Sequence, residues 1–135
     1  VIYTGPIDYF FNYKFGKLPY RSIRFEFKNY KIDSYQQASH INFVDEYVPY
    51  TRITEHKKLS GQINYSTTIS IEYPQQDGEP YYPIPTEGNR KQYLLYKNET
   101  EKLNNVSFCG RLAEYQYYNM DQVVVNTLRT FNRVL

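Results

Sequence analysis

A strict two-residue alternation between Tyr65 and Tyr73 constrains the fold of this chain more than any other feature. Odd-numbered positions carry Tyr, Thr and Ile, whereas even-numbered positions carry Ser, Thr and Glu. Successive side chains of a strand point to opposite faces, so this pattern predicts an antiparallel strand with one buried and one wet face. The alternation of Ile23, Phe25 and Phe27 with charged residues predicts a second half-buried strand.

The composition favours a mixed α+β fold. Tyr supplies 17 of the 135 residues but Ala only two, at Ala38 and Ala113. An Ala-poor chain rich in aromatic and β-branched residues is a poor candidate for a helical bundle. Leu, Ile, Val and Phe together make up about a quarter of the chain, which is enough to build a core.

Helical patterns flank the strand-rich block on both sides. We expect Asp8 to cap a short helix that ends at Gly16, and Asn89 to cap a helix that runs to about Leu103. An apolar strand at 106–109 ends in a glycine, and a polar aromatic loop leads to a last helix with Asn119 and Gln122 in capping-box spacing. That helix carries one apolar stripe, formed by Met120, Val124, Leu128, Phe131 and Leu135.

Several classes of protein are disfavoured by the composition. No apolar run approaches the roughly 18–20 residues of a membrane span, and the start at Val1 has neither Met nor the pattern of a signal peptide, so we expect a piece of a longer protein. The single Cys109 cannot form an internal disulfide and fits a reducing, cytoplasmic compartment. One cysteine and two histidines make a metal site unexpected, and a net charge of +2 disfavours nucleic acid as a partner.

Three parts of the chain combine Arg with Tyr, at 19–21, at 49–52, and at 81–83 together with 110–111 and 115–119. A guanidinium offers a planar fork to a phosphate and a phenol adds a neutral donor, so the combination suits a diphosphate. Arg beside Tyr at a sheet edge is, however, often just a stacked, solvated pair. Likewise, a strand–Gly loop–helix unit can face an anionic ligand, but many α/β proteins contain one without a ligand. The patterns alone leave these alternatives open.

Five motifs follow one another along the chain: VIYTGPID at 1–8, GKLPYRS at 16–22, VPYTRITEHK at 48–57, EPYYP at 79–83 and GRLAEYQYYNMD at 110–121. Together they resemble the C-terminal part of bacterial UDP-galactopyranose mutases. The N-terminal G-x-G-x-x-G dinucleotide fingerprint of that family and its helical domain with a mobile lid are absent from these 135 residues.

The resemblance implies a domain organisation and an activity. Residues 19–75 would form an antiparallel substrate domain, flanked by αβ pieces of an FAD-binding fold at 1–18 and 76–135. The implied isomerisation interconverts UDP-galactopyranose and UDP-galactofuranose through an adduct between N5 of reduced FAD and the sugar. The implied partners are N-terminal domains of the same protein. A homodimer is a further assembly that the resemblance leaves open. We expect the 135 residues alone to be inactive and to bind FAD weakly or not at all.

The resemblance also assigns site residues, none of them a metal ligand. Arg52 corresponds to the fixed catalytic Arg near flavin and diphosphate, and Arg21 to a second active-site Arg. The substrate would meet the hydroxyls of Tyr82 and Tyr117 at its diphosphate, with Asn42 and Asn119 nearby. The FAD would meet Gly110, Arg111, Met120, Asp121 and Gln122.

One position departs from the family, which usually has Asp-Met-Asp where this chain has Asn119-Met120-Asp121. Asn keeps the hydrogen bonding and the helix capping of Asp but loses its charge.

The residues by themselves leave two other functions open. A stand-alone sugar- or nucleotide-binding module would also use a Tyr-rich surface, while a single-strand nucleic-acid binder is disfavoured by the near-neutral charge.

Overall fold

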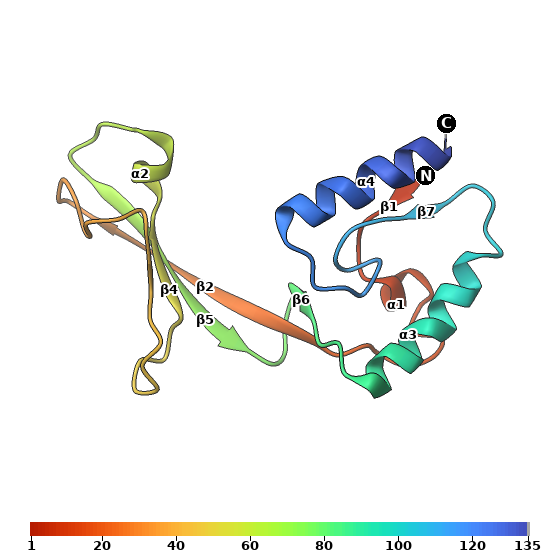
Figure 1. Ribbon diagram of the computed structural model, residues 1–135. Coiled ribbons are helices and arrows are strands. Elements are labelled where there is room, and N and C mark those ends of the chain that lie inside the picture. Colours follow the sequence, from red (N-terminus) through yellow and green to blue (C-terminus); the bar gives the residue numbers. More distant parts are fainter. Residues whose placement is uncertain (135) are drawn as a thin grey trace. The chain divides into compact units, whose positions relative to one another are not determined.

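The chain forms two compact units in this computed structural model, which describes residues 1–134 and the side chains of residues 1–132 (Figure 1). The first unit combines Val1–Arg21 with Glu79–Leu135, and the second is Ser22–Gly78. Leu135, the last member of the predicted apolar stripe, lies outside the described residues. The fold is mixed α+β, as predicted. The identification of the units with an FAD-binding and a substrate domain stays a prediction.

The second unit is built on an antiparallel sheet. Its strands lie in the order β3 (His40–Asn42), β4 (Arg52–Glu55), β5 (Thr67–Gln75) and β2 (Tyr20–Tyr30), and β2 begins two residues before this unit. The short helix α2 (His56–Ser60) links β4 to β5 and ends at Gly61, whose φ of 68° is readily adopted only without a Cβ. The alternation predicted around Tyr65–Tyr73 therefore does form a strand, which begins two residues later.

The core of this unit gathers on one face of the sheet. Ile53, Ile69 and Ile71 are buried, and four partly buried rings pack against them, those of Tyr30, Phe43, Tyr50 and Tyr73. Ile53 lies directly opposite Ile71 in the β4–β5 pair, so the two side chains share that face.

The β2–β5 register puts the Phe side chains of β2 on the opposite face. Ile71 is paired with Glu26, whereas Phe25 is paired with Glu72 and Phe27 with Ser70. Side chains directly opposite each other share a face, so Phe25 and Phe27 lie away from the isoleucine core. Phe27 is 64% exposed. The strand is confirmed, but the expectation that its apolar side is buried is wrong, because the register pairs the apolar side of β2 with the polar side of β5.

The first unit combines two small strand pairs with three helices. Strand β1 (Ile2–Tyr3) runs parallel to β7 (Ser107–Phe108), and β6 (Tyr82–Pro83) is antiparallel to the first two residues of β2. The helices are α1 (Ile7–Phe10), α3 (Glu87–Thr100) and α4 (Met120–Val134). The core consists of the buried residues Ile7, Leu18, Tyr96 and Tyr115, with Phe11, Phe15, Tyr20, Tyr93 and Phe108 packed around them.

Two of the predicted helix caps are wrong. Asp8 lies inside the first turn of α1, which Pro6 precedes, and its buried carboxylate accepts hydrogen bonds from Leu18 N (2.9 Å) and Tyr20 Oη (3.3 Å). The N-cap of α3 is Thr86, whose hydroxyl accepts from the backbone N–H of Asn89. Asp8 and Asn89 are both polar residues at a suitable spacing, but neither is the N-cap of its helix.

The apolar stripe of α4 faces away from its own unit. Met120, Val124, Leu128 and Phe131 are 82%, 57%, 57% and 52% exposed. Val123, Asn126 and Thr130 are the partly buried residues among the described side chains of this helix, and the hydroxyl of Thr127, at the edge of the stripe, lies 3.2 Å from the Sγ atom of Cys109. Within the described part of the chain, no helix combines the length and apolar character needed to cross a membrane.

Candidate functional site

Two tyrosines and an arginine predicted for ligand binding form one cluster in the first unit. The rings of Tyr82 and Tyr117 lie 5.6 Å apart at an interplanar angle of 31°. The guanidinium carbon of Arg111 lies 5.5 Å from the Tyr82 ring centre and 5.6 Å from that of Tyr117. The Nε atom of Arg111 donates to the carbonyl oxygen of Tyr118 at 2.7 Å, which holds the cation in place beside both rings. The segments at 81–82 and 110–119, which are distant in sequence, thus meet at one point.

Arg21 belongs to the same neighbourhood through the sheet. It lies directly opposite Tyr82 in the β2–β6 pair, where Cβ atoms are about 5 Å apart. Its backbone oxygen accepts a hydrogen bond from Tyr81 N at 3.1 Å, which fixes the strand beside the cluster. Among the ion pairs between described residues, none involves Arg21 or Arg111. Arg111 beside the two rings and Arg21 opposite Tyr82 in register are thus two cations that no described carboxylate pairs with.

The loop that carries Arg111 and Tyr117 is anchored by Tyr115, a residue that the sequence analysis did not single out. Its ring is buried against those of Tyr20 and Tyr93, and its hydroxyl donates to the carbonyl oxygen of Pro19 at 2.6 Å. Burial raises the pKa of Tyr115, so the phenol stays a neutral donor. Its φ of 46° is unusual for a residue with a Cβ, and such strain persists only where surrounding contacts hold it. The sequence offers no sign of which Tyr in this loop is the anchor.

Of the residues predicted to meet FAD, Met120, Asp121 and Gln122 begin α4, whereas Gly110 and Arg111 lie in the loop before it. Asn119 O accepts the first helical hydrogen bond, from Val123 N, and the side-chain oxygen of Gln122 accepts from Asn119 N at 2.8 Å. This confirms the Gln122 half of the predicted capping box. Gly110 has a φ of 95°, donates its N–H to the Glu114 carboxylate at 2.9 Å, and would meet no atom within 4 Å if it carried a Cβ. With Met120 and Asp121 exposed as well, the helix start is open to a ligand.

The remaining predicted site residues lie on the sheet of the second unit. Asn42, Arg52 and Glu72 lie directly opposite one another across β3, β4 and β5. The Nε atom of Arg52 donates to Asn42 Oδ1 at 2.9 Å, and its Nη1 atom lies 3.7 Å from Glu72 Oε1. The predicted residues thus fall into two groups, one in each unit. Glu72 was not predicted, although its place in an alternating strand puts it on the polar side.

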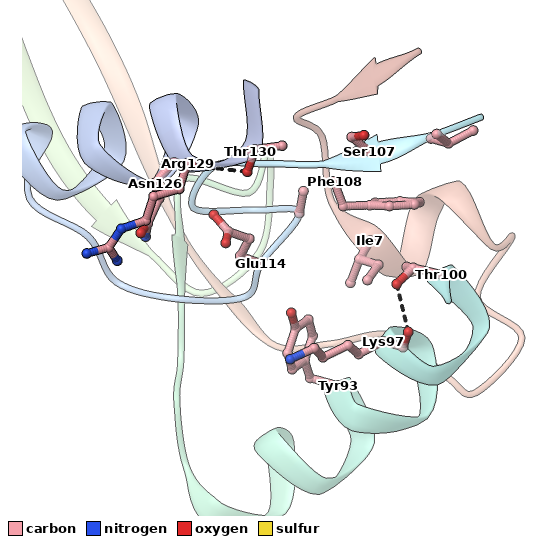
Figure 2. Close-up of a pocket in the computed structure, with 12 residues that line it drawn as sticks. Ile7, Tyr93, Lys97, Thr100, Ser107, Phe108, Glu114, Asn126, Arg129 and Thr130 are labelled. Atoms are coloured by element: carbon pink, nitrogen blue, oxygen red, sulfur yellow. Dashed lines mark hydrogen bonds between the residues drawn. The ribbon is translucent and has the colours of Figure 1, made fainter. Parts of the chain in front are cut away.

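A cavity of about 390 Å³ lies elsewhere in the first unit (Figure 2). Figure 2 shows side chains of α3 and α4 around it, with Lys97 and Tyr93 on one side and Asn126, Arg129 and Thr130 on the other. Its lining does not include any of the eleven predicted site residues, all of which are among those that the structure describes. Among the described residues there is also no group of three side chains suited to hold a metal ion.

Comparisons with known proteins match this chain to UDP-galactopyranose mutases, the family that its motifs resemble. A family model described as UDP-galactopyranose mutase matches residues 1–117. A probable UDP-galactopyranose mutase of Klebsiella pneumoniae is 38% identical over 139 aligned residues, covering 100% of this chain and 36% of that protein. A dTDP-fucopyranose mutase of Escherichia coli is 36% identical, covering 90% and 33%, and a UDP-galactopyranose mutase of Mycoplasma genitalium is 34% identical, covering 100% and 35%.

The chain thus has a mixed α+β fold, and Arg and Tyr side chains from its matched motifs gather at one point. The chain belongs to the UDP-galactopyranose mutase family. It spans about a third of the length of the curated relatives that it matches. The predicted correspondence to the C-terminal part of this family is confirmed.

Proposed function

We propose that these residues belong to an isomerase that interconverts UDP-galactopyranose and UDP-galactofuranose with the help of FAD. The observation that carries the proposal is the cluster of Tyr82, Tyr117 and Arg111, with Arg21 across the strand pair. The names of two of the relatives reported above supply the substrate class, and that of the Escherichia coli relative names a different nucleotide sugar. All of these substrates carry a diphosphate, which this cluster suits.

The cluster would bind the diphosphate by combining charge with neutral donors. The Tyr82 and Tyr117 hydroxyls would donate to phosphate oxygens, and Tyr117 is 54% exposed and accessible to a ligand. Arg111 and Arg21 would supply the positive charge that a departing diphosphate requires. Since Arg111 lies beside both rings, it would also keep the two phenols side by side before the ligand arrives.

The residues around the start of α4 fit an FAD molecule. A long helix with an open N-terminus favours a pyrophosphate, Arg111 adds a cation, and Gly110 lets a ligand approach the backbone closely. Met120, Asp121 and Gln122 would line this approach, with Asn119 near the sugar. The chemistry that reduced FAD supplies when bound is a nucleophilic nitrogen for the anomeric carbon. Arg52, steadied by Asn42, would stabilise the diphosphate as it leaves that carbon.

We further propose that residues 1–18 and 76–135 belong to an FAD-binding domain, and that 19–75 form the substrate domain. The two compact units, which divide at 21–22 and 78–79, support this division. N-terminal domains of the same protein would complete the FAD site, and the enzyme would work in the cytoplasm. The alternative is a sugar- or nucleotide-binding module without catalysis, which the same Arg–Tyr cluster would serve.

Turnover by the full-length protein tests the proposal. Purified protein, reduced with dithionite, would be incubated with UDP-galactofuranose, with dTDP-fucopyranose in parallel, and the products separated by chromatography. We expect conversion to UDP-galactopyranose, and we expect Arg52→Ala to lower kcat by about a hundredfold or more. Lys91→Ala is the matched control, because Lys91 is exposed on α3 and its ion-pair partner Glu87 is exposed as well. Binding of UDP without conversion of either sugar would favour the module instead, and near-normal turnover in Arg52→Ala would remove Arg52 from the catalytic role.

A further inference from the structure

Arg52 lies between two fixed neighbours in one row across the sheet. Asn42 precedes it in the row and Glu72 follows it, and all three side chains extend from the same face because their residues are directly opposite in register. The Asn42 amide oxygen accepts from Nε at 2.9 Å, and the Glu72 carboxylate lies 3.7 Å from Nη1. Long Arg side chains have many rotamers, so two contacts on different nitrogens restrict the guanidinium far more than one.

The side chain of Glu72 is largely shielded from solvent, and its backbone is fixed to the segment before Arg52. Its side chain is only 14% exposed, whereas that of Arg52 is 45% exposed. The Glu72 carbonyl oxygen accepts from the backbone N–H of Thr51 at 2.9 Å, so the strand segments before Arg52 and at Glu72 are joined directly. A shielded carboxylate beside a more exposed cation can orient that cation and leave part of it open to solvent.

The same pairing lowers the charge that Arg52 offers to an anion. Among the hydrogen bonds and ion pairs between described residues, none engages Nη2, so this nitrogen can still donate to a phosphate oxygen. A diphosphate must, however, compete with the Glu72 carboxylate for the guanidinium. Glu72 therefore fixes the orientation of the Arg52 guanidinium but lowers the affinity of Arg52 for the anion. The lower affinity favours release of a bound nucleotide.

We propose that Glu72 is a positioning residue for Arg52, and that it weakens the hold of Arg52 on the nucleotide diphosphate. The inference rests on the proposed function, because it assumes that Arg52 meets that diphosphate. It predicts an effect that a merely structural residue would not have. Loss of the Glu72 charge should tighten UDP binding and at the same time slow turnover.

The test compares three variants of the full-length protein, using UDP as the ligand for titration calorimetry and UDP-galactofuranose for turnover. Glu72→Gln keeps the shape and removes the charge, so we expect the Kd for UDP to fall about two- to fivefold and kcat to fall about tenfold or more. Glu72→Asp keeps the charge and should return the Kd to that of the wild type. The gap in Kd should narrow as NaCl is raised, since salt screens the pair.

Glu26→Gln is the matched control. Glu26 is paired with Lys28 at 3.0 Å and lies on the other face of the same sheet, opposite Ile71. An unchanged or raised Kd for UDP in Glu72→Gln, in a wild type that is active and depends on Arg52, would overturn this inference alone. A wild type without turnover would overturn the proposed function and the inference with it.

Discussion

Glu55 is a buried carboxylate that the sequence does not distinguish from its exposed neighbours. Its side chain is 0% exposed and accepts hydrogen bonds from Tyr35 N at 3.0 Å, Gln36 N at 3.1 Å and the Thr67 hydroxyl at 2.7 Å. Burial works to raise the pKa of Glu55, but these hydrogen bonds and the charge of Lys58 together lower it to about 2. Glu55 thus ties the loop before β3 to β4 and β5.

The lowered pKa of Glu55 makes the stability of the second unit depend on pH. A depressed folded-state pKa contributes stability above the ordinary value of 4.5, and this contribution is lost as the pH falls from about 5 toward 2. We expect Glu55→Gln to cost about 2 kcal/mol at pH 7, because one buried N–H loses its acceptor. Urea unfolding at pH 7 and pH 3 measures this. The cost should shrink at pH 3, while exposed Glu46→Gln should change little at either pH.

Tyr115 and Tyr117 are two residues apart and should respond in opposite ways to the loss of a hydroxyl. We expect Tyr115→Phe to lower the free energy of unfolding by about 1–2 kcal/mol, because the buried hydrogen bond to Pro19 is lost. Tyr117→Phe should leave stability within about 0.5 kcal/mol, because its ring is 54% exposed, but it should weaken UDP binding about tenfold or more. Thermal unfolding and UDP titration of the full-length variants test both. Equal losses of stability would contradict the assignment of Tyr115 as the anchor.

At the scale of elements, the register of β2 against β5 decides which apolar side chains build the core. Both strands alternate, and nothing in either pattern says which sides will coincide. Because Phe27 is paired with Ser70 and Lys28 with Ile69, a shift by one residue would reverse the arrangement. The alternation made the two strands predictable from the sequence. The exposure of Phe25 and Phe27 was not predictable, because it depends on the register.

Paired substitutions test this register. We expect Ile69→Ala to cost about 3 kcal/mol, since its side chain is fully buried. Phe27→Ala, which removes a larger side chain, should cost less than about 1 kcal/mol because the ring is 64% exposed. Denaturant unfolding of the full-length protein gives both values. A larger cost for Phe27→Ala than for Ile69→Ala would mean that the Phe side of β2 is the buried one, or is covered by another part of the protein.

At the scale of the whole molecule, several surfaces of the first unit lack a cover among the described residues. The parallel β1–β7 pair has only two strands, and α4 exposes its apolar stripe. Parallel sheets are normally buried on both faces, and an exposed stripe of this kind is typical of an interface. Both features agree with a chain that spans about a third of its relatives.

We therefore expect a polypeptide of these 135 residues alone not to hold FAD in stoichiometric amount and to lack mutase activity. Gly110, Arg111 and the first residues of α4 would meet only part of such a cofactor, and no G-x-G-x-x-G occurs in the sequence. Flavin absorbance of the gel-filtered polypeptide, after incubation with FAD, measures binding, and the full-length protein is the control. A yellow polypeptide with one flavin per chain would contradict the expectation.

The sequence by itself determined the family, the mixed fold and the strands β2, β5 and β7, because motifs and alternation are local properties that can be read along the chain. It also predicted that Tyr82 and Tyr117 meet one diphosphate, although only through resemblance. Tertiary structure decided what no local pattern contains: the register that exposes Phe27, the burial of Glu55 and Asp8, and the choice of Tyr115 as the loop anchor. Each of these depends on a partner distant in sequence, since a side chain is buried or exposed by what packs against it.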